Sequence, residues 1–331
     1  MTQRYNRIWG GLIGVAYGDA YGMPSEMWSP KAIKSYFGKI NDFLPGPPEN
    51  IISKNLLRGE VTDDTMNTKF VVEMLSEAGG KVDTNLFIKK LRNWSETCDK
   101  STAVTGPSTA KAFAQLDAGV PMEEAGKTGI TNGAAMKILP VGFIADYHDL
   151  CDLAEEVRQL CLPTHNTSAA ISGACAIAAA GAYAVAGEKD LDQMLEAACR
   201  AAKLGAEKGY EVIAPSIEKR ILLGKQLVDQ SDNEMEAISA IYDIIGSGLP
   251  ITESVPAALS LVYLSKGNPI RCAGYCANLG GDTDTIGAMA CGICGAFSGG
   301  DIFPQAGVDL LEQVNELSFR AMADLLVKVL K

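Results

Sequence analysis

Two long stretches of small apolar residues constrain the fold of this 331-residue chain more than any other feature. One stretch begins at Ser168 and reads SAAISGACAIAAAGAYAVAG, and the other begins at Asp284 and reads DTIGAMACGICGAFSGG. A helix that is apolar on all sides has to be buried, and its glycines and alanines let neighbouring backbones approach closely. Transmembrane helices can have a similar composition, but these stretches contain few Leu or Phe residues. We therefore expect both to lie at the centre of a helical bundle.

Helical periodicity continues through most of the chain. Apolar residues recur at intervals of three and four, and segments with the alternation of a strand are nearly absent. We expect helices over residues 64–78, 85–98, 107–118, 150–161, 168–186, 191–204, 217–228, 234–245, 254–266 and 308–330. Residues 30–59 lack this pattern, contain a Pro-Gly-Pro-Pro run and are expected to form a loop. Because no linker, repeat or low-complexity tract divides the chain, we predict an all-α fold in a single domain over residues 1–331.

The charge of the chain narrows the classes of partner. Forty acidic and 29 basic residues give a formal net charge of −11, and no Lys/Arg-rich run is present. This balance argues against nucleic acid or an anionic membrane surface as the main partner. The N-terminal segment has neither a secretory apolar region nor a span long enough for a bilayer, so we expect a cytoplasmic protein. A monomer is the default expectation.

Few histidines and many cysteines limit the metal chemistry. His148 and His165 are the only histidines and the HExxH motif is absent, which excludes a histidine-rich zinc site. The nine cysteines are an odd number, and most stand among Ala, Ile and Gly, as buried free thiols do. Cys291 and Cys294 have CxxC spacing, but no second pair and no βαβ setting accompany them, so we interpret them as core residues.

A first cluster of carboxylates precedes an expected amphipathic helix. Thr62, Asp63, Asp64 and Thr65 stand together there, where one side-chain oxygen would be enough to cap the helix. Two adjacent carboxylates and two hydroxyls supply more oxygen ligands than capping requires. The carboxylates would also repel one another without a cation.

A second cluster, Asp282-Thr283-Asp284-Thr285, stands at the start of an apolar helix. Burial of that helix start would bury both aspartates, and no Lys or Arg lies within ten residues to pair with them. An all-oxygen ligand set favours Mg²⁺, and two converging clusters would form a two-metal centre. The string also matches the DxDx[TV] motif of haloacid-dehalogenase-like phosphatases, but that motif ends a strand of a doubly wound sheet, which is not expected here.

Glu26 is a lone acid after a third notable segment. A small-residue helix that contains Asp19 is expected to stop at Pro24, and Glu26 follows. Taken by itself, Glu26 has the sequence context of an ordinary exposed loop residue.

Five segments, taken in order, resemble the ADP-ribosylglycohydrolase superfamily, which includes the dinitrogenase-reductase-activating glycohydrolases and the ADP-ribosyl-arginine and ADP-ribosyl-serine hydrolases. They are the opening GGLIGVAYGDAYGMPSE, GEVTDDTMNT, TNGAAMKILPVG, THNTSAA and GGDTDTIGAM. The third segment departs from the family pattern, because Lys137 stands where Arg is usual and lacks its planar bidentate fork.

The resemblance implies an all-α orthogonal bundle with a binuclear magnesium site, for which Mn²⁺ is an alternative. The metal ligands that it implies are Thr62, Asp63, Asp64, Asp282, Asp284 and Thr285. Glu26 and Asp63 become candidates for catalytic proton transfer. The residues that it places along the substrate cleft are Gly106, Ser108, Asn132, Gly133, Ala134 and His165. A buried imidazole with satisfied hydrogen bonds remains the alternative for His165.

The activity implied by the resemblance is hydrolysis of a glycosidic bond at C1 of an ADP-ribosyl group, on a modified protein or a small metabolite. The ribose hydroxyls would lie over the metal pair, beside a metal-associated water. Two alternatives remain open: a hydrolase of a small N-ribosyl metabolite or nucleoside, and a catalytically silent binding or structural relative. The leaving group, whether arginine, serine, nucleobase or another metabolite, is not indicated by the sequence, and neither are the residues that contact adenine.

Overall fold

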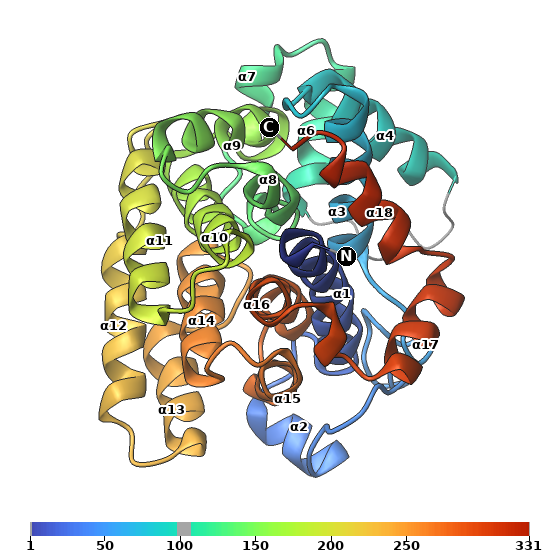
Figure 1. The fold of residues 1–331 in the computed structure, drawn as a ribbon, viewed down its shortest axis with the longest axis vertical. Coiled ribbons are helices and arrows are strands. Elements are labelled where there is room, and N and C mark those ends of the chain that lie inside the picture. The colour runs from blue at the N-terminus through green and yellow to red at the C-terminus, as the bar shows by residue number, and fades with distance from the viewer. Residues whose placement is uncertain (1, 98–106, 331) are drawn as a thin grey trace.

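The fold is built from helices. The structure is a computed structural model that describes residues 2–97 and 107–330, and within these ranges it contains no β-strand. Three isolated β-bridges join distant segments, at Trp28 with Gly281, Thr131 with Pro250, and Thr167 with Tyr210. The predicted all-α class is therefore confirmed (Figure 1).

The α-helices of the described residues are α1 (Gln3–Gly22), α2 (Pro30–Phe37), α3 (Asp63–Glu77), α4 (Thr84–Thr97), α6 (Pro107–Asp117), α7 (Met122–Ala125), α8 (Leu139–Ile144), α9 (Leu150–His165), α10 (Ser168–Ala186), α11 (Leu191–Ala206), α12 (Ile217–Gln230), α13 (Glu234–Ala240), α14 (Ile251–Leu264), α15 (Pro269–Leu279), α16 (Thr283–Ser298), α17 (Gln305–Asn315) and α18 (Phe319–Val327). Short 3₁₀ segments are η1 (Met23–Ser25), η2 (Asn132–Ala134) and η4 (Gly300–Ile302), and η3 (Ile241–Ile245) is a π-helical turn.

Helices α1 and α16 pack against each other near the middle of the molecule, and α11 and α12 lie at its outer edge (Figure 1). Glycine makes the close approach of α1 and α16 possible. A Cβ atom added at Gly18 would lie 2.0 Å from the carbonyl oxygen of Gly287, so a larger residue cannot fit there without moving a helix. This contact places the last part of α1, which carries Asp19, beside the start of α16, which carries Asp284.

The two small-residue stretches form α10 and α16, as expected. Among the described residues, α10 is the one helix that is long and apolar enough to cross a membrane by length and composition. Within the fold, however, 94% of its apolar window is buried, which is the environment predicted for a central bundle helix.

Two expectations about secondary structure were wrong. The segment expected to be a loop begins with the helix α2, where Pro30 occupies the first turn and the Ser29 hydroxyl accepts from the Ala32 N–H at 3.2 Å. The helix expected over residues 308–330 is divided into α17 and α18. It is interrupted because Glu316 adopts a left-handed conformation (φ +52°), and the Asn315 side chain bonds to the loop carbonyl of Gly59.

Candidate active site

Acidic side chains from four parts of the chain meet at the ends of α1, α3 and α16. Asp19, Asp64 and Asp284 can each offer a carboxylate oxygen within 4.8 Å of the others, and the same holds for Glu26, Asp282 and Asp284. Asp284 belongs to both groups. The two predicted aspartate clusters therefore meet in space, and Glu26 joins them.

Asp19 organises the start of α3, although it is not among the predicted site residues. Its carboxylate accepts from the N–H of Thr62 at 3.0 and 3.1 Å, from the N–H of Thr65 at 3.1 Å and from the Thr65 hydroxyl at 2.5 Å. The available signal was a single carboxylate inside a helix whose other residues from position 10 to 22 are small, apolar or tyrosine. Such an acid has to face a polar site or another helix end.

One carboxylate oxygen of Asp64 accepts hydrogen bonds and the other accepts none. The hydroxyls of Thr62 and Thr285 donate to Oδ2 at 2.9 and 3.2 Å, whereas the buried Oδ1 has no hydrogen-bond partner. Oδ1 of Asp284 is likewise buried without a partner. Unpaired buried carboxylate oxygens are costly, and each has the chemistry of a ligand for a hard cation.

Asp282 and Glu26 are positioned by backbone contacts between distant segments. The Asp282 N–H donates to the Ser247 carbonyl at 2.7 Å, and the Asn132 side chain donates to the Asp282 carboxylate. Glu26 is brought to the same place because Met27 and Trp28 exchange backbone hydrogen bonds with Gly281, at 2.7 and 2.9 Å. The segment after α1 is thereby fixed to the loop before α16.

Burial raises the pKa of every carboxyl group in this site, and repulsion by neighbouring carboxylates raises it further for Glu26, Asp63, Asp64 and Asp284. Burial raises the pKa of Asp19 to about 6, and burial together with Asp19 and Asp282 raises that of Asp63 to about 7. The pKa values of Glu26, Asp64 and Asp284 lie well above the ordinary range for the same two reasons. A divalent cation would remove both the repulsion and the cost of burial.

Asp63 and Lys137 lie at the margin of this arrangement. The Asp63 side chain is partly exposed and belongs to neither of the two groups of close oxygens. Lys137 is buried and lowers the pKa of Asp63, but its amine donates to the carbonyl of Gly133. Burial lowers the pKa of Lys137 itself. A single lysine therefore cannot balance the charge of the acidic groups.

His165 packs against η2, which contains the predicted substrate residues Asn132, Gly133 and Ala134. Its Nε2 lies 2.9 Å from the Thr131 hydroxyl, which in turn lies 3.0 Å from that of Ser108, and its Nδ1 lies 2.8 Å from the Thr164 hydroxyl. A Cβ atom at Gly133 would lie 2.9 Å from the imidazole ring. His165 is 1% exposed, and burial lowers its pKa well below the ordinary value. It has the surroundings of the satisfied buried imidazole that the sequence left as an alternative.

Of the other predicted substrate residues, Asn132 and Ala134 are buried and Ser108 is half-buried. Gly106 lies outside the described residues.

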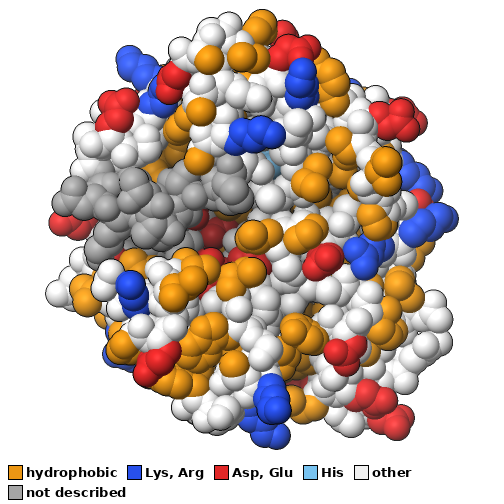
Figure 2. Space-filling view, turned by 180° about the vertical axis from the view of Figure 1, so that it is seen from behind, with side chains coloured by type: hydrophobic (Ala, Val, Ile, Leu, Met, Phe, Trp, Pro, Cys, Tyr) orange, Lys and Arg blue, Asp and Glu red, His pale blue; other side chains and the backbone are white. Residues whose placement is uncertain are grey.

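Figure 2 shows acidic side chains recessed in a hollow on the face turned away from the viewer in Figure 1.

Replacement of His165 by alanine should destabilise the protein. The change removes the imidazole that contacts the hydroxyls of Thr131 and Thr164 and leaves a cavity in its place, and we expect a loss of about 2–4 kcal/mol in the free energy of unfolding. Denaturant unfolding measures this loss. The matched control is His148→Ala, because His148 is exposed. Wild-type stability in His165→Ala would contradict the supporting role.

Comparisons with known proteins identify the family of the chain. A model of the family described as ADP-ribosylglycohydrolase matches residues 1–331. The chain is 38% identical to the uncharacterized protein YegU of Escherichia coli over 323 residues, which cover 97% of this chain and 96% of that protein. It is 26% identical to the ADP-ribosylhydrolase ARH3 of Homo sapiens over 353 residues, covering 96% and 92% of the two chains.

A solved structure described as an ADP-ribosylglycohydrolase-related protein complex has the same fold. The TM-score is 0.70 at 22% identity, and the match covers 100% of both chains. The sequence resemblance is thus confirmed by the family match over the whole chain. This chain is a member of the ADP-ribosylglycohydrolase family.

Proposed function

We propose that the protein is a magnesium-dependent hydrolase that cleaves the glycosidic bond at C1 of an ADP-ribosyl group. The single observation that carries this proposal is the position of Asp284, which has a carboxylate oxygen within 4.8 Å of those of Asp19 and Asp64 and also of those of Glu26 and Asp282. A carboxylate shared in this way is suited to bridge two cations. Membership of the family supports the ADP-ribosyl group as the substrate.

The donor atoms fit magnesium. They are carboxylate and hydroxyl oxygens, and two of the carboxylate oxygens are buried without a partner. We assign the metal ligands to Thr62, Asp63, Asp64, Asp282, Asp284 and Thr285. Asp19 joins this proposed set as the residue that fixes the start of α3 and has an oxygen close to Asp64 and Asp284. When bound, the ions supply positive charge that orients the ribose and activates water.

The side chains around the metal ligands hold them in one arrangement. Thr62 and Thr285 fix Oδ2 of Asp64 and so leave Oδ1 for a ligand, and Asn132 fixes the carboxylate of Asp282. In this proposal, Glu26 takes the proton of the attacking water, since it lies within 4.8 Å of the oxygens of Asp282 and Asp284. Asp63 is the second proton-transfer group, at the partly exposed edge of the site.

Aromatic rings next to Glu26 offer a surface for adenine. The rings of Trp28 and Tyr36 lie 5.2 Å apart, and that of Phe37 lies 4.8 Å from Tyr36. The Tyr36 side chain is 49% exposed at the end of α2. A flat aromatic ligand can stack on such a surface, so we assign the adenine contact to this group.

Hydrolysis assays test the proposed function. The protein is incubated with ADP-ribosyl-arginine, ADP-ribosyl-serine and a panel of nucleosides, with Mg²⁺ or with a chelator. We expect ADP-ribose to be released only with Mg²⁺. Cleavage of nucleosides alone would assign the enzyme to small N-ribosyl compounds instead. Failure to cleave any of these compounds would favour a silent binding protein.

Stabilisation by magnesium should grow with pH. The metal-free carboxyls have raised pKa values, about 6 for Asp19 and about 7 for Asp63, so protons occupy them at low pH and compete with the cation. We expect the rise in Tm caused by Mg²⁺ to be at least about twofold larger near pH 8 than near pH 5. Thermal unfolding with and without Mg²⁺ measures it. An equal rise at both pH values would contradict proton competition.

A further inference from the structure

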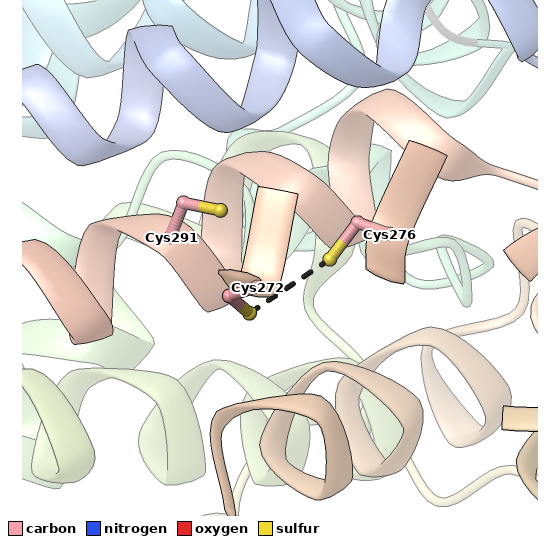
Figure 3. Close-up of side chains that lie close together, drawn as sticks. All are labelled: Cys272, Cys276 and Cys291. Atoms are coloured by element: carbon pink, nitrogen blue, oxygen red, sulfur yellow. Dashed lines mark hydrogen bonds between the residues drawn. The ribbon is translucent and has the colours of Figure 1, made fainter. Parts of the chain in front are cut away.

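Four cysteines gather between α15 and α16, away from the acidic site. Cys272 and Cys276 lie on α15, and Cys291 and Cys294 lie on α16. The sulfur atoms of Cys272, Cys276 and Cys291 all lie within 4.8 Å of one another, and those of Cys272 and Cys276 are 4.0 Å apart. Figure 3 shows these three side chains on neighbouring helices with their sulfurs turned toward a common space.

Helix geometry explains this gathering. Residues three or four apart share one face of a helix, so each helix presents a pair of thiols to the other. In the sequence, Cys291 and Cys294 have no second CxxC pair, because Cys272 and Cys276 have the spacing C-x₃-C and lie on a helix that the periodicity does not predict. Packing of α15 on α16 supplies that pair.

The cluster is enclosed and reduced. All four cysteines are fully buried, and all are free thiols. Their remaining contacts are weak ones: Cys291 donates to the Pro269 carbonyl at 3.6 Å, and Cys294 lies 3.5 Å from the Ser265 hydroxyl. Four thiols in one buried apolar space bring four soft ligand atoms together.

We propose that this cluster binds one soft metal ion, Zn²⁺ or Cu⁺, through Cys272, Cys276 and Cys291, with Cys294 as the fourth ligand. Sulfur ligands about 2.3 Å from a tetrahedral zinc ion are about 3.8 Å apart, which is close to the 4.0 Å between the sulfurs of Cys272 and Cys276. Thiolates select soft ions, whereas the carboxylates select hard ones. Each thiol releases its proton to solvent as its sulfur binds the ion, and no oxidation is involved.

The ion would connect the two helices that flank the loop carrying Asp282. Cys291 follows Asp284 by seven residues, or about 10 Å along α16, so the two sites are separate. Cys276 lies six residues before Asp282 on the other side of the loop. A thiolate-bound ion would therefore fix the loop that positions Asp282, without itself contacting the substrate.

Cobalt and copper binding test the proposal on the full-length chain. The protein is reduced and treated with a chelator, and excess Mg²⁺ is added to occupy the oxygen ligands. It is then titrated with Co²⁺ as a probe for Zn²⁺, or with Cu⁺ in competition with a chromogenic chelator. Because the thiols are buried, a second sample is loaded with zinc or copper during expression. We expect about one ion per chain and, for Co²⁺, the charge-transfer bands of thiolate ligands.

Variants separate this site from the acidic one. Cys276→Ala and Cys291→Ala should each lose affinity for the ion by about 100-fold or more, whereas Cys175→Ala, which removes a buried cysteine of α10, should bind normally. Retained stabilisation by Mg²⁺ shows that a variant is folded. Preference between Zn²⁺ and Cu⁺ identifies the ion. Absence of thiolate bands and of retained metal in the wild-type protein, or normal binding by the folded Cys276→Ala variant, would overturn the proposal.

Discussion

Asp284→Ala should abolish hydrolysis and the stabilisation by Mg²⁺ together. Asp284 belongs to both groups of close carboxylates, and one of its oxygens has no protein partner. Residues that only support metal ligands change activity by 10–100-fold when removed, so loss of a shared ligand should lower kcat/KM by about 100-fold or more. Since ion binding to the native state is also folding free energy, the rise in Tm with Mg²⁺ should disappear.

In the metal-free protein, the substitution Asp284→Ala should not lower the Tm. Burial and the nearby charges of Glu26, Asp282 and Asp64 raise the pKa of Asp284, so the carboxyl group is unfavourable there without a cation. The metal-free Tm of Asp284→Ala should therefore be no lower than that of the wild-type protein, despite the lost side chain. Asp232→Ala, at an exposed acid, is the control. Normal turnover by Asp284→Ala would exclude the two-metal centre.

The meeting of the two aspartate clusters could be predicted because each cluster has a local signature. Asp64 and Asp284 both stand in the first turn of a helix, beside threonines, in numbers that capping does not explain. A charged group at the start of an apolar helix needs a partner, and the sequence around Asp282 offers no cation. Local chemistry thus predicts a cation at each cluster, and the structure brings the two clusters together.

The position of Glu26 could not be derived from its own surroundings in the sequence. It depends on an isolated bridge between Trp28 and Gly281, two residues separated by most of the chain. Periodicity carries no information about such a bridge, and only the resemblance to a family suggested a role for Glu26. Asp19 was missed for a related reason, since its partners are backbone N–H groups of another helix.

The cysteine cluster also depends on a contact between two helices that the sequence pattern does not reveal. Cys272 and Cys276 have helical spacing, but the helix α15 that carries them was not expected, and nothing in the sequence pairs it with α16. The expectation that most cysteines are buried is confirmed for the described residues, where Cys151 alone is exposed. Burial by itself did not reveal that four of them share one space.

Glu26→Gln should remove turnover and leave binding in place. Glutamine keeps the size of the side chain and the backbone contacts, including the bond from the Asn50 amide to the Glu26 carbonyl at 2.9 Å. It cannot accept the proton of the attacking water, and loss of such a group costs about 10²–10⁴-fold in kcat. Steady-state kinetics should therefore show a lowered kcat, while calorimetry shows wild-type affinity for ADP-ribose.

The stability of this variant decides between a catalytic and a structural role for Glu26. Burial and the charges of Asp282, Asp63 and Asp19 raise its pKa, so the neutral amide should leave the metal-free protein at least as stable as the wild type. The rise in Tm with Mg²⁺ should also remain, because Asp284 and Asp64 still offer their free oxygens. Glu207→Gln, at an exposed acid, controls for the substitution itself. If Glu26→Gln lost affinity for ADP-ribose and stability together, Glu26 would be a structural residue and not the acceptor of the proton.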